Sequence, residues 1–208
     1  QMVSGVGHIL LGLALFSERG MGAGLFYMAH HILTMSALVT SSAAIEFTYG
    51  SGRLTRLGGL MRREQTLAFC MAVGLLSLIG LPTTSGTWGK VGLATAAGDA
   101  TGTAPWFFLG SMVVASIASL MALQHMWREV FWGPLPNTYL PDDPKKGRGE
   151  PKPLTDDVVV PTRLKVVPVV LTTLVIALFF CAGPLLPFFT DAGNALFDVV
   201  PYIEQVLP

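Results

Sequence analysis

Long apolar stretches are the feature that most constrains how this chain can fold. A transmembrane helix needs about 20 predominantly apolar residues, and stretches of roughly that length recur along the 208 residues. They cover residues 2–17, 22–46, 65–82 with a continuation over 87–97, 105–127 and 166–189. Only 12% of the residues are charged, about half the share that is usual in a soluble domain. The sequence therefore predicts an all-α polytopic membrane protein with five transmembrane helices.

Basic residues are concentrated in alternate links between these stretches. The links at 47–64 and 133–165 are rich in Lys and Arg, whereas the link at 18–21 has one Arg and the link at 98–104 has no basic residue. Because cytoplasmic loops carry the excess of basic residues, this alternation predicts that both basic links are cytoplasmic. It also requires the stretch 65–97 to cross the membrane once, as one broken helix.

These links divide the chain into predicted regions. Residues 1–132 form a transmembrane bundle, 133–165 a proline-rich cytoplasmic loop, 166–190 the final transmembrane helix and 191–208 an extracytoplasmic tail. Since Gln1 already lies inside an apolar stretch, we expect more chain upstream. The apolar stretches make the lipid bilayer an expected partner. The 13 basic and 13 acidic residues cancel, so nucleic acid is not expected as a partner.

Lys90 lies within the broken stretch, where an ammonium group costs at least about 2.5–3.5 kcal/mol. Pro82, Thr84, Ser85 and Gly86 precede it and predict an unwound segment, which is tolerated at membrane depth only where it lines a cavity. Broken helices of this kind are typical of ion-coupled transporters. A desolvated lysine can load and release a proton, so we interpret Lys90 as a proton-translocating residue. The alternative is that its side chain snorkels to the interface.

Two adjacent histidines, His30 and His31, lie in the centre of the stretch 22–46. Neighbouring side chains point about 100° apart on a helix, so both cannot face one partner. His31 shares a helix face with Thr34, and an unperturbed pKa of about 6.5 makes histidine a natural proton relay. The alternative is a structural histidine that is hydrogen-bonded to a neighbouring helix. Without a matching set of ligands, no metal site is expected.

Other ionisable residues leave both functional and structural roles open. His125 lies near the predicted cytoplasmic end of its helix and is either an exit for protons or an anchor in the aromatic belt. His8 is either a further relay or a structural residue. Glu46 and Glu64 flank the first basic link, and we expect them to pair with its arginines.

Four motifs stand out along the chain and read HHILTMSALVTSSAAIE, GSGRLTRLGGL, SLIGLPTTSGTWGK and MWREVFWG. Together they resemble the antiporter-like subunits shared by complex I and Mrp cation/proton antiporters, most of all the D-type subunits of the Mrp (Mnh) complexes. The resemblance covers essentially the whole chain. It implies that these are the last five of about fourteen transmembrane helices, within the second of two inverted repeats. It further implies that Lys90 ends a hydrophilic axis through the membrane and that His31 is a relay one helix earlier.

The chain departs from the family pattern at two positions. Met35 stands where many members have a lysine, and Thr87 stands where an aromatic residue is usual. Methionine cannot hold a proton, so water or Thr34 has to bridge that part of the axis.

The resemblance implies a membrane subunit of a multisubunit Na⁺/H⁺ antiporter in the plasma membrane. Its partners are then other membrane subunits, and protons move between His31 and Lys90 with His125 as a candidate exit. No covalent catalysis and no cofactor are expected. One alternative is a proton-pumping subunit of a complex I-like NADH-quinone oxidoreductase, and another is a non-conducting scaffold subunit.

Overall fold

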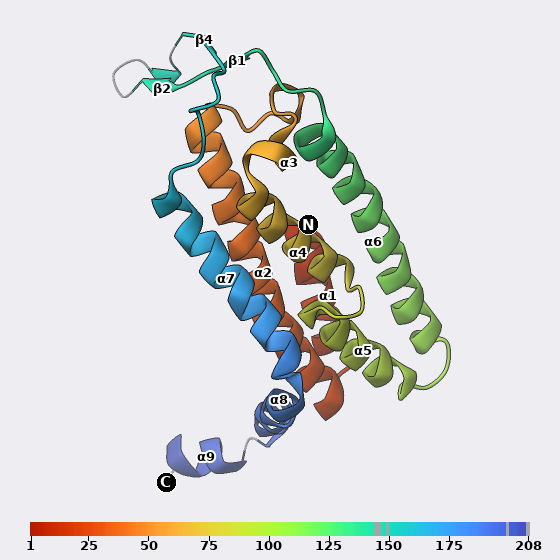
Figure 1. Ribbon diagram of the computed structural model, residues 1–208. Helices are drawn as coiled ribbons and strands as arrows, with labels where there is room; N and C mark the ends of the chain where they lie inside the picture. Colours follow the sequence, from red (N-terminus) through yellow and green to blue (C-terminus); the bar gives the residue numbers. More distant parts are fainter. Residues whose placement is uncertain (144–146, 149, 199, 207–208) are drawn as a thin grey trace. The chain divides into compact units, whose positions relative to one another are not determined.

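The computed structural model describes residues 1–143, 147–148, 150–198 and 200–206, and helices dominate it (Figure 1). The α-helices are α1 (Met2–Ala14), α2 (Glu18–Tyr49), α3 (Leu60–Arg63), α4 (Gln65–Ile79), α5 (Ser85–Gly98), α6 (Ala104–Trp127), α7 (Thr162–Phe180), α8 (Ala182–Phe197) and α9 (Val200–Val206). The short 3-10 helix η1 (Leu54–Arg56) precedes α3, and the π-helix η2 (Arg128–Trp132) continues α6. The predicted all-α fold is confirmed.

Within the described part of the chain, three helices are long and apolar enough to cross a membrane. They are α2, α6 together with η2, and α7. The helices α1 and α4 are also apolar but shorter. A helix satisfies its backbone hydrogen bonds within its own segment, which a bilayer demands of any spanning element. The chain is thus a polytopic membrane protein, as its apolar stretches predict.

The link between η2 and α7 contains two short antiparallel strand pairs. β1 (Thr138–Tyr139) pairs with β4 (Lys152–Pro153), and β2 (Asp142–Asp143) pairs with β3 (Gly147–Arg148). The remainder of the described link is irregular apart from a few turns. The helix α7 begins at the end of the link that the sequence predicted to be loop, so the basic residues Arg163 and Lys165 belong to its first turn.

The final apolar stretch is divided between two helices. Cys181 has φ −89° and ψ 4° and separates α7 from α8. Pro184 lies in the first turn of α8, where a helix has backbone N–H groups without an intrahelical acceptor, so a proline is tolerated there. The helix α8 extends to Phe197, past the predicted end of the last span at residue 190.

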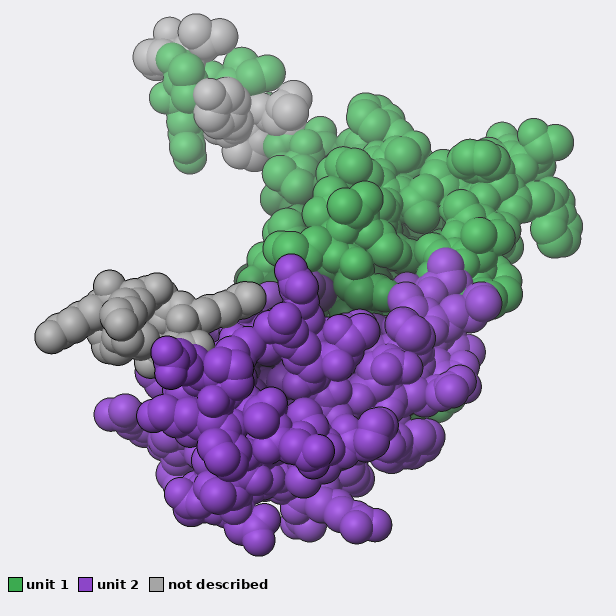
Figure 2. Space-filling model, turned by 90° about the horizontal axis from the view of Figure 1, so that it is seen from above, with its two compact units in different colours: residues 1–32, 77–117, 175–208 green, residues 33–76, 118–174 purple. Residues whose placement is uncertain are grey.

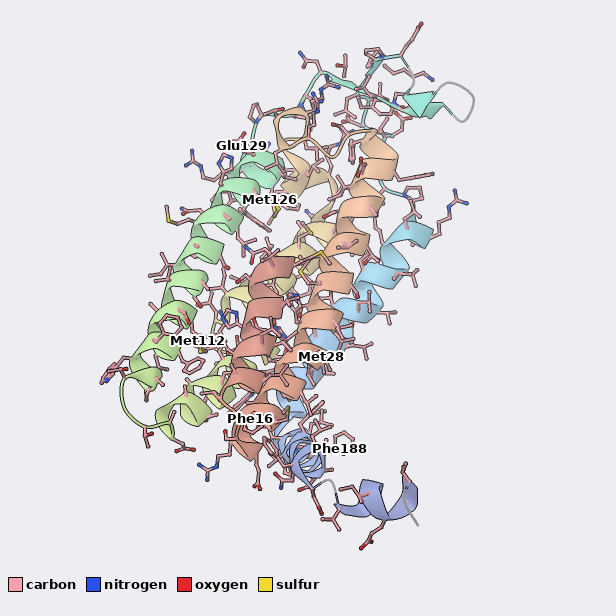
Figure 3. All side chains as sticks on the ribbon, turned by 180° about the vertical axis from the view of Figure 1, so that it is seen from behind. Phe16, Met28, Met112, Met126, Glu129 and Phe188 are labelled. Atoms are coloured by element: carbon pink, nitrogen blue, oxygen red, sulfur yellow. The ribbon has the colours of Figure 1, made fainter. Side chains whose placement is uncertain are left out.

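The chain forms two compact units, each drawn in its own colour in Figure 2. Unit 1 comprises residues 1–32, 77–117 and 175–208, and unit 2 comprises residues 33–76 and 118–174. The core of unit 1 brings α1, α2, α5 and α6 together. It contains the buried side chains Ala23, Tyr27, Leu93 and Met112, of which Met112 is labelled in Figure 3.

Glycines allow α1 and α2 to approach closely within unit 1. A Cβ atom on Gly12 would lie 2.7 Å from the Cα atom of Gly24 and 2.7 Å from the carbonyl oxygen of Gly20. Small residues at such crossings let helix backbones pack without lipid between them. The packing positions His8 of α1 against Tyr27 of α2.

A buried carboxylate joins the two basic links within unit 2. Glu64 is fully buried, and its Oε1 accepts hydrogen bonds from Tyr49 Oη at 3.1 Å and from the backbone N–H of Val160 at 2.6 Å. Its Oε2 lies 2.7 Å from Lys165 Nζ. The prediction that Glu64 pairs with an arginine is therefore wrong. The first link instead reaches across to the second link and to α7.

The other acidic residue that flanks the first link behaves differently from Glu64. Glu46 forms none of the ion pairs found among the described residues. Its carboxylate instead lies close to the backbone of Gly52, where an added Cβ atom would be 3.1 Å from Oε2.

Candidate functional site

The chain is not helical from residue 80 to residue 84, between α4 and α5. Gly80 has φ +83° and Thr83 has φ +77°. A left-handed conformation is ordinary for glycine, but it is an outlier for a β-branched residue. Strained backbone of this kind persists only where the surrounding structure enforces it, and it gathers at functional sites. The side chains around this break are therefore candidates for a functional site.

The predicted break residues divide between the unwound segment and the next helix. Pro82 lies in the unwound segment, and Thr84 is the N-cap residue of α5. Ser85 and Gly86 form the first turn of α5, so their assignment to the break is corrected. Proline is compatible with the unwound segment because it has no N–H group to satisfy there.

Lys90 extends from α5 back to the end of α4. Its Nζ donates hydrogen bonds to the carbonyl oxygen of Ile79 at 2.7 Å and to Ser116 Oγ of α6 at 2.7 Å. A Cβ atom on Gly80 would lie 2.7 Å from Lys90 Cδ, so the glycine leaves room for the lysine stem. The residue is half-buried, and no carboxylate among the described residues pairs with it. Lys90 is thus held by neutral acceptors.

An open cavity of about 340 Å³ borders this lysine within unit 1. Apolar side chains dominate its walls. It is lined by Gly80, Thr87, Lys90, Val91, Ala94, Leu109, Met112, Val113, Ser116 and Ile117. An ammonium group has three N–H donors, and two of those on Lys90 have acceptors. The third is available to water or another proton acceptor in the cavity.

His30 is the histidine that contacts the first turn of α5. Its Nδ1 lies 2.9 Å from Ser85 Oγ, and Ser85 Oγ lies 3.3 Å from Ser77 Oγ. All three side chains are buried. A Cβ atom on Gly86 would lie 1.9 Å from the carbonyl oxygen of Ser77. Only glycine therefore allows α5 to approach the end of α4 so closely.

His31 faces α1 instead. Its ring stacks on Tyr27 with a centroid separation of 6.3 Å, and Tyr27 stacks on His8 at 5.1 Å. A Cβ atom on Gly5 of α1 would overlap the His31 ring, with 1.9 Å to Cε1. His8 Nδ1 lies 2.8 Å from the carbonyl oxygen of Ser4. The two histidines of α2 thus contact different helices, α5 for His30 and α1 for His31, because adjacent side chains on a helix point in different directions.

Thr34 and His125 belong to unit 2, whereas Lys90, His30 and His31 belong to unit 1. Thr34 is fully buried and Met35 is half-buried, while His125 is exposed on α6. The structure thus gathers the lysine and both α2 histidines into one unit. The relay role of Thr34 and the exit role of His125 stay predictions.

Sequence reasoning missed two serines at this site. Ser77 completes the hydrogen bonds of His30 and Ser85, and Ser116 accepts from Lys90. Isolated serines are common in transmembrane helices and resemble packing residues in a sequence. Their polarity within an apolar run was the one available signal.

Comparisons with known proteins found a matching family model and a similar solved structure. The family model described as "NADH:quinone oxidoreductase/Mrp antiporter, TM" matches residues 2–124. A chain in the solved structure of the Mrp complex from Dietzia sp. superposes over 100% of this chain and 43% of its own length, with a TM-score of 0.89 and 30% sequence identity.

Curated relatives carry two kinds of name. The D subunit of the Na(+)/H(+) antiporter of Alkalihalophilus pseudofirmus is 26% identical over 99% of this chain and 38% of its own length. An N subunit of the NADH-quinone oxidoreductase of Solidesulfovibrio magneticus is 40% identical over 47% of this chain and 21% of its own length. The chain spans less than half the length of these relatives.

Proposed function

This chain belongs to the NADH:quinone oxidoreductase/Mrp antiporter family, and on that premise we propose that it is part of a membrane subunit of a multisubunit monovalent cation/proton antiporter. Its exchanged ions are Na⁺ and H⁺, its partners are other membrane subunits, and its location is the plasma membrane. Relatives named as the D subunit of a Na(+)/H(+) antiporter, which align with nearly the whole chain, support this proposal.

The observation that carries the proposal is the environment of Lys90. Its ammonium group donates to the carbonyl oxygen of Ile79 and to Ser116 Oγ. After deprotonation, the Ser116 hydroxyl can rotate and donate to the neutral amine, because a hydroxyl is both donor and acceptor. Both protonation states therefore have a hydrogen-bonding partner, and no carboxylate in the described residues locks the lysine in its charged form. These are the requirements for a lysine that alternates between the two states.

Protons reach Lys90 from the histidine side of the break in this proposal. The hydrogen-bonded series His30, Ser85 and Ser77 ends at α4, two residues before the carbonyl group of Ile79 that accepts from Lys90. Water in the break completes the connection, since a carbonyl group cannot pass a proton on. His31 lies beside Tyr27 on the side of α1, and in this proposal water carries protons between it and the series, because stacked rings pass no proton. Thr34 and His125, which belong to unit 2, are further residues that we propose to take part in proton transfer.

Lys90→Ala tests the proposal in cells that lack other Na⁺ exporters. We expect the assembled complex to lose Na⁺/H⁺ exchange and the cells to lose salt resistance. Lys152→Ala is the matched control, because Lys152 is an exposed lysine in the link before α7. Normal exchange by the assembled Lys90→Ala variant would leave the chain as a scaffold and contradict the proposal.

The two histidines can be separated by the same assay. His30→Ala removes the hydrogen bond that joins α2 to Ser85 beside the break, so we expect a clear loss of exchange. His31→Ala removes a ring that faces α1, and we expect a milder loss. Equal activity of both variants and the unmodified protein would exclude a relay through α2.

A second candidate function is a proton-pumping subunit of an NADH-quinone oxidoreductase. The relative named as an N subunit of that complex, at 40% identity over 47% of this chain, favours it. Lys90 and the histidines would then perform the same proton transfers with a redox reaction as the motor. Purification of the intact complex distinguishes the two candidates. Quinone-binding and iron–sulfur subunits would indicate the pump, whereas small membrane subunits alone would indicate the antiporter.

A further inference from the structure

A second cavity lies in unit 2, where α3 packs against η2. Its volume is about 460 Å³, larger than a single phosphate group. It is lined by Gly59, Met61, Arg62, Arg63, Phe131, Trp132, Gly133 and Leu135. Two arginines thus line the cavity together with large apolar side chains.

One of these guanidinium groups has an unused donor. The Arg63 side chain is only 9% exposed. Its Nη2 donates to the carbonyl oxygen of Thr155 and lies 3.7 Å from Asp156 Oδ1. Its Nη1 is buried and has no hydrogen-bond partner among the described residues. Leaving a buried charged donor unsatisfied is costly, so an anion beside Nη1 would stabilise this arrangement.

Arg62, the second arginine of the cavity, adds a positive charge that no acidic lining residue balances. The Arg62 side chain belongs to an exposed residue and takes part in none of the ion pairs found in the described residues. Asp156 balances Arg63 in part, and no acidic residue is among those that line the cavity. Arginine is the favoured ligand for phosphate, because its planar fork of donors matches two phosphate oxygens.

The apolar walls indicate more than a free anion. Trp132 is 69% exposed and Met61 is 43% exposed, although both line a cavity that also holds arginines. Trp132 ends the apolar span formed by α6 and η2, and Met61 belongs to α3, which packs against η2. The end of this span carries aromatic and charged residues typical of the membrane interface, Glu129 (labelled in Figure 3) among them. At such an interface the lipid phosphates lie next to the ends of the acyl chains.

Two glycines near the cavity, Gly58 and Gly133, have no room for a side chain. A Cβ atom on Gly58 would lie 2.1 Å from the carbonyl oxygen of Pro134, and one on Gly133 would lie 2.3 Å from that of Glu129. The π-helical turn of η2 widens the end of α6 at the same place, and such turns are frequent at functional sites. The cavity is therefore a consequence of specific backbone geometry.

We propose that the cavity between α3 and η2 binds the phosphate group of an anionic phospholipid, held by Arg62 and Arg63, with the acyl chains against Met61 and Trp132. Basic pockets at the cytoplasmic ends of transmembrane helices are suited to such headgroups. The site is separate from Lys90 and does not depend on the proposed transport function.

Thermal unfolding of the purified complex in detergent, with added lipid, tests this proposal. Phosphatidylglycerol is the probe, and phosphatidylcholine and inorganic phosphate at equal concentration are the comparisons. We expect phosphatidylglycerol to raise the unfolding temperature and to remain bound in native mass spectra. Arg62→Gln should weaken that binding at least about tenfold, as the loss of one charge-assisted hydrogen bond implies. Arg53→Gln, an exposed arginine of the same link outside the cavity, should leave binding unchanged.

Three results would overturn the proposal. An equal effect of phosphatidylcholine would remove the role of the negative charge. An equal effect of inorganic phosphate would make this a site for a free anion. An equal loss from Arg53→Gln would show only a general attraction of the basic link to anionic membranes. Arg63→Gln also removes the contacts to Thr155 and Asp156, so Arg62→Gln provides the decisive comparison.

Discussion

At the scale of single residues, the site depends on glycines as much as on ionisable groups. Gly5 accommodates the His31 ring, Gly80 accommodates the Lys90 stem, and Gly86 allows α5 to reach Ser77. Each of these positions lacks space for one further carbon atom. The placement of the side chains that we propose to carry protons can therefore be tested without altering them.

Gly86→Ala should disturb the contact between His30 and Ser85. The added Cβ atom would lie 1.9 Å from the carbonyl oxygen of Ser77, so α5 has to move away from α4. Overpacking of this kind costs about 1–3 kcal/mol of stability, and we expect exchange activity to fall as well. Gly98→Ala is the control on the same helix, because no atom lies within 4 Å of its added Cβ. Thermal unfolding and exchange assays on both variants check this, and equal behaviour would contradict it.

Gly5→Ala should displace the His31 ring from its place against α1. The added Cβ atom would overlap three atoms of the imidazole ring at 1.9–2.3 Å, whereas nothing lies within 4 Å of a Cβ atom on Gly7. We expect Gly5→Ala to destabilise the protein by about 1–3 kcal/mol and Gly7→Ala to be neutral or slightly stabilising. The histidine resonances of the two variants report the displacement directly. An unshifted His31 signal in Gly5→Ala would show that the ring lies elsewhere.

At the scale of elements, unit 2 contains a buried ion pair that joins the start of α7 to the residue before α4. Glu64 is 0% exposed and the Lys165 side chain 21% exposed, at an N–O distance of 2.7 Å. The pair is completed by donors from Tyr49 and Val160. Oε1 thus accepts two hydrogen bonds and Oε2 lies in an ion pair with Lys165, and such compensation is the condition under which a buried charge is tolerated.

Removing one partner of this pair should be strongly destabilising. Lys165→Met leaves the buried carboxylate of Glu64 without its cation, and we expect a loss of about 3–5 kcal/mol. The exposed pair of Arg19 and Asp99, at 74% and 56% side-chain exposure, supplies the control. Arg19→Met should cost less than about 1 kcal/mol. Equal thermal stability of the two variants would show that the Glu64 pair contributes no more than a surface pair.

At the scale of the whole molecule, the distribution of basic residues makes a prediction about sidedness. The links at 47–64 and 133–165 contact each other through Glu64 and its partners. They therefore lie on one side of the membrane. The positive-inside rule predicts that this side is the cytoplasm, while the segment 191–208 lies outside.

Cysteine labelling tests this orientation. In a background with Cys70→Ser and Cys181→Ser, we expect Asn137→Cys to react with a membrane-impermeant maleimide only in inside-out vesicles. Glu204→Cys should react only in right-side-out vesicles. Both positions are exposed. The reverse pattern would invert the topology, and reaction of both from one side would contradict the number of crossings.

The family of the chain and the existence of its membrane helices could be predicted from the sequence, because length, apolarity and basic links are properties of contiguous segments. The free-energy cost of a charged lysine at position 90, inside an apolar stretch, could be predicted for the same reason. The strained backbone at Thr83 was not, since a left-handed threonine has no signature in a sequence. Nor was the extension of α8 past residue 190, because Pro187 lies inside this helix, where a proline in the sequence predicts a break.

The sequence by itself determined that the chain lies in a membrane, that one of its helices breaks before a lysine, and that two basic links share a side. Only the tertiary structure decided that His30 rather than His31 meets the break, that Ser116 accepts from Lys90, and that Glu64 pairs with Lys165 rather than an arginine. The physical reason is distance along the chain. His30 and Ser85 are 55 residues apart, and Lys90 and Ser116 are 26 apart. Such pairs meet only through the packing of separate helices. Gly5, Gly80 and Gly86 permit the close contacts in that packing.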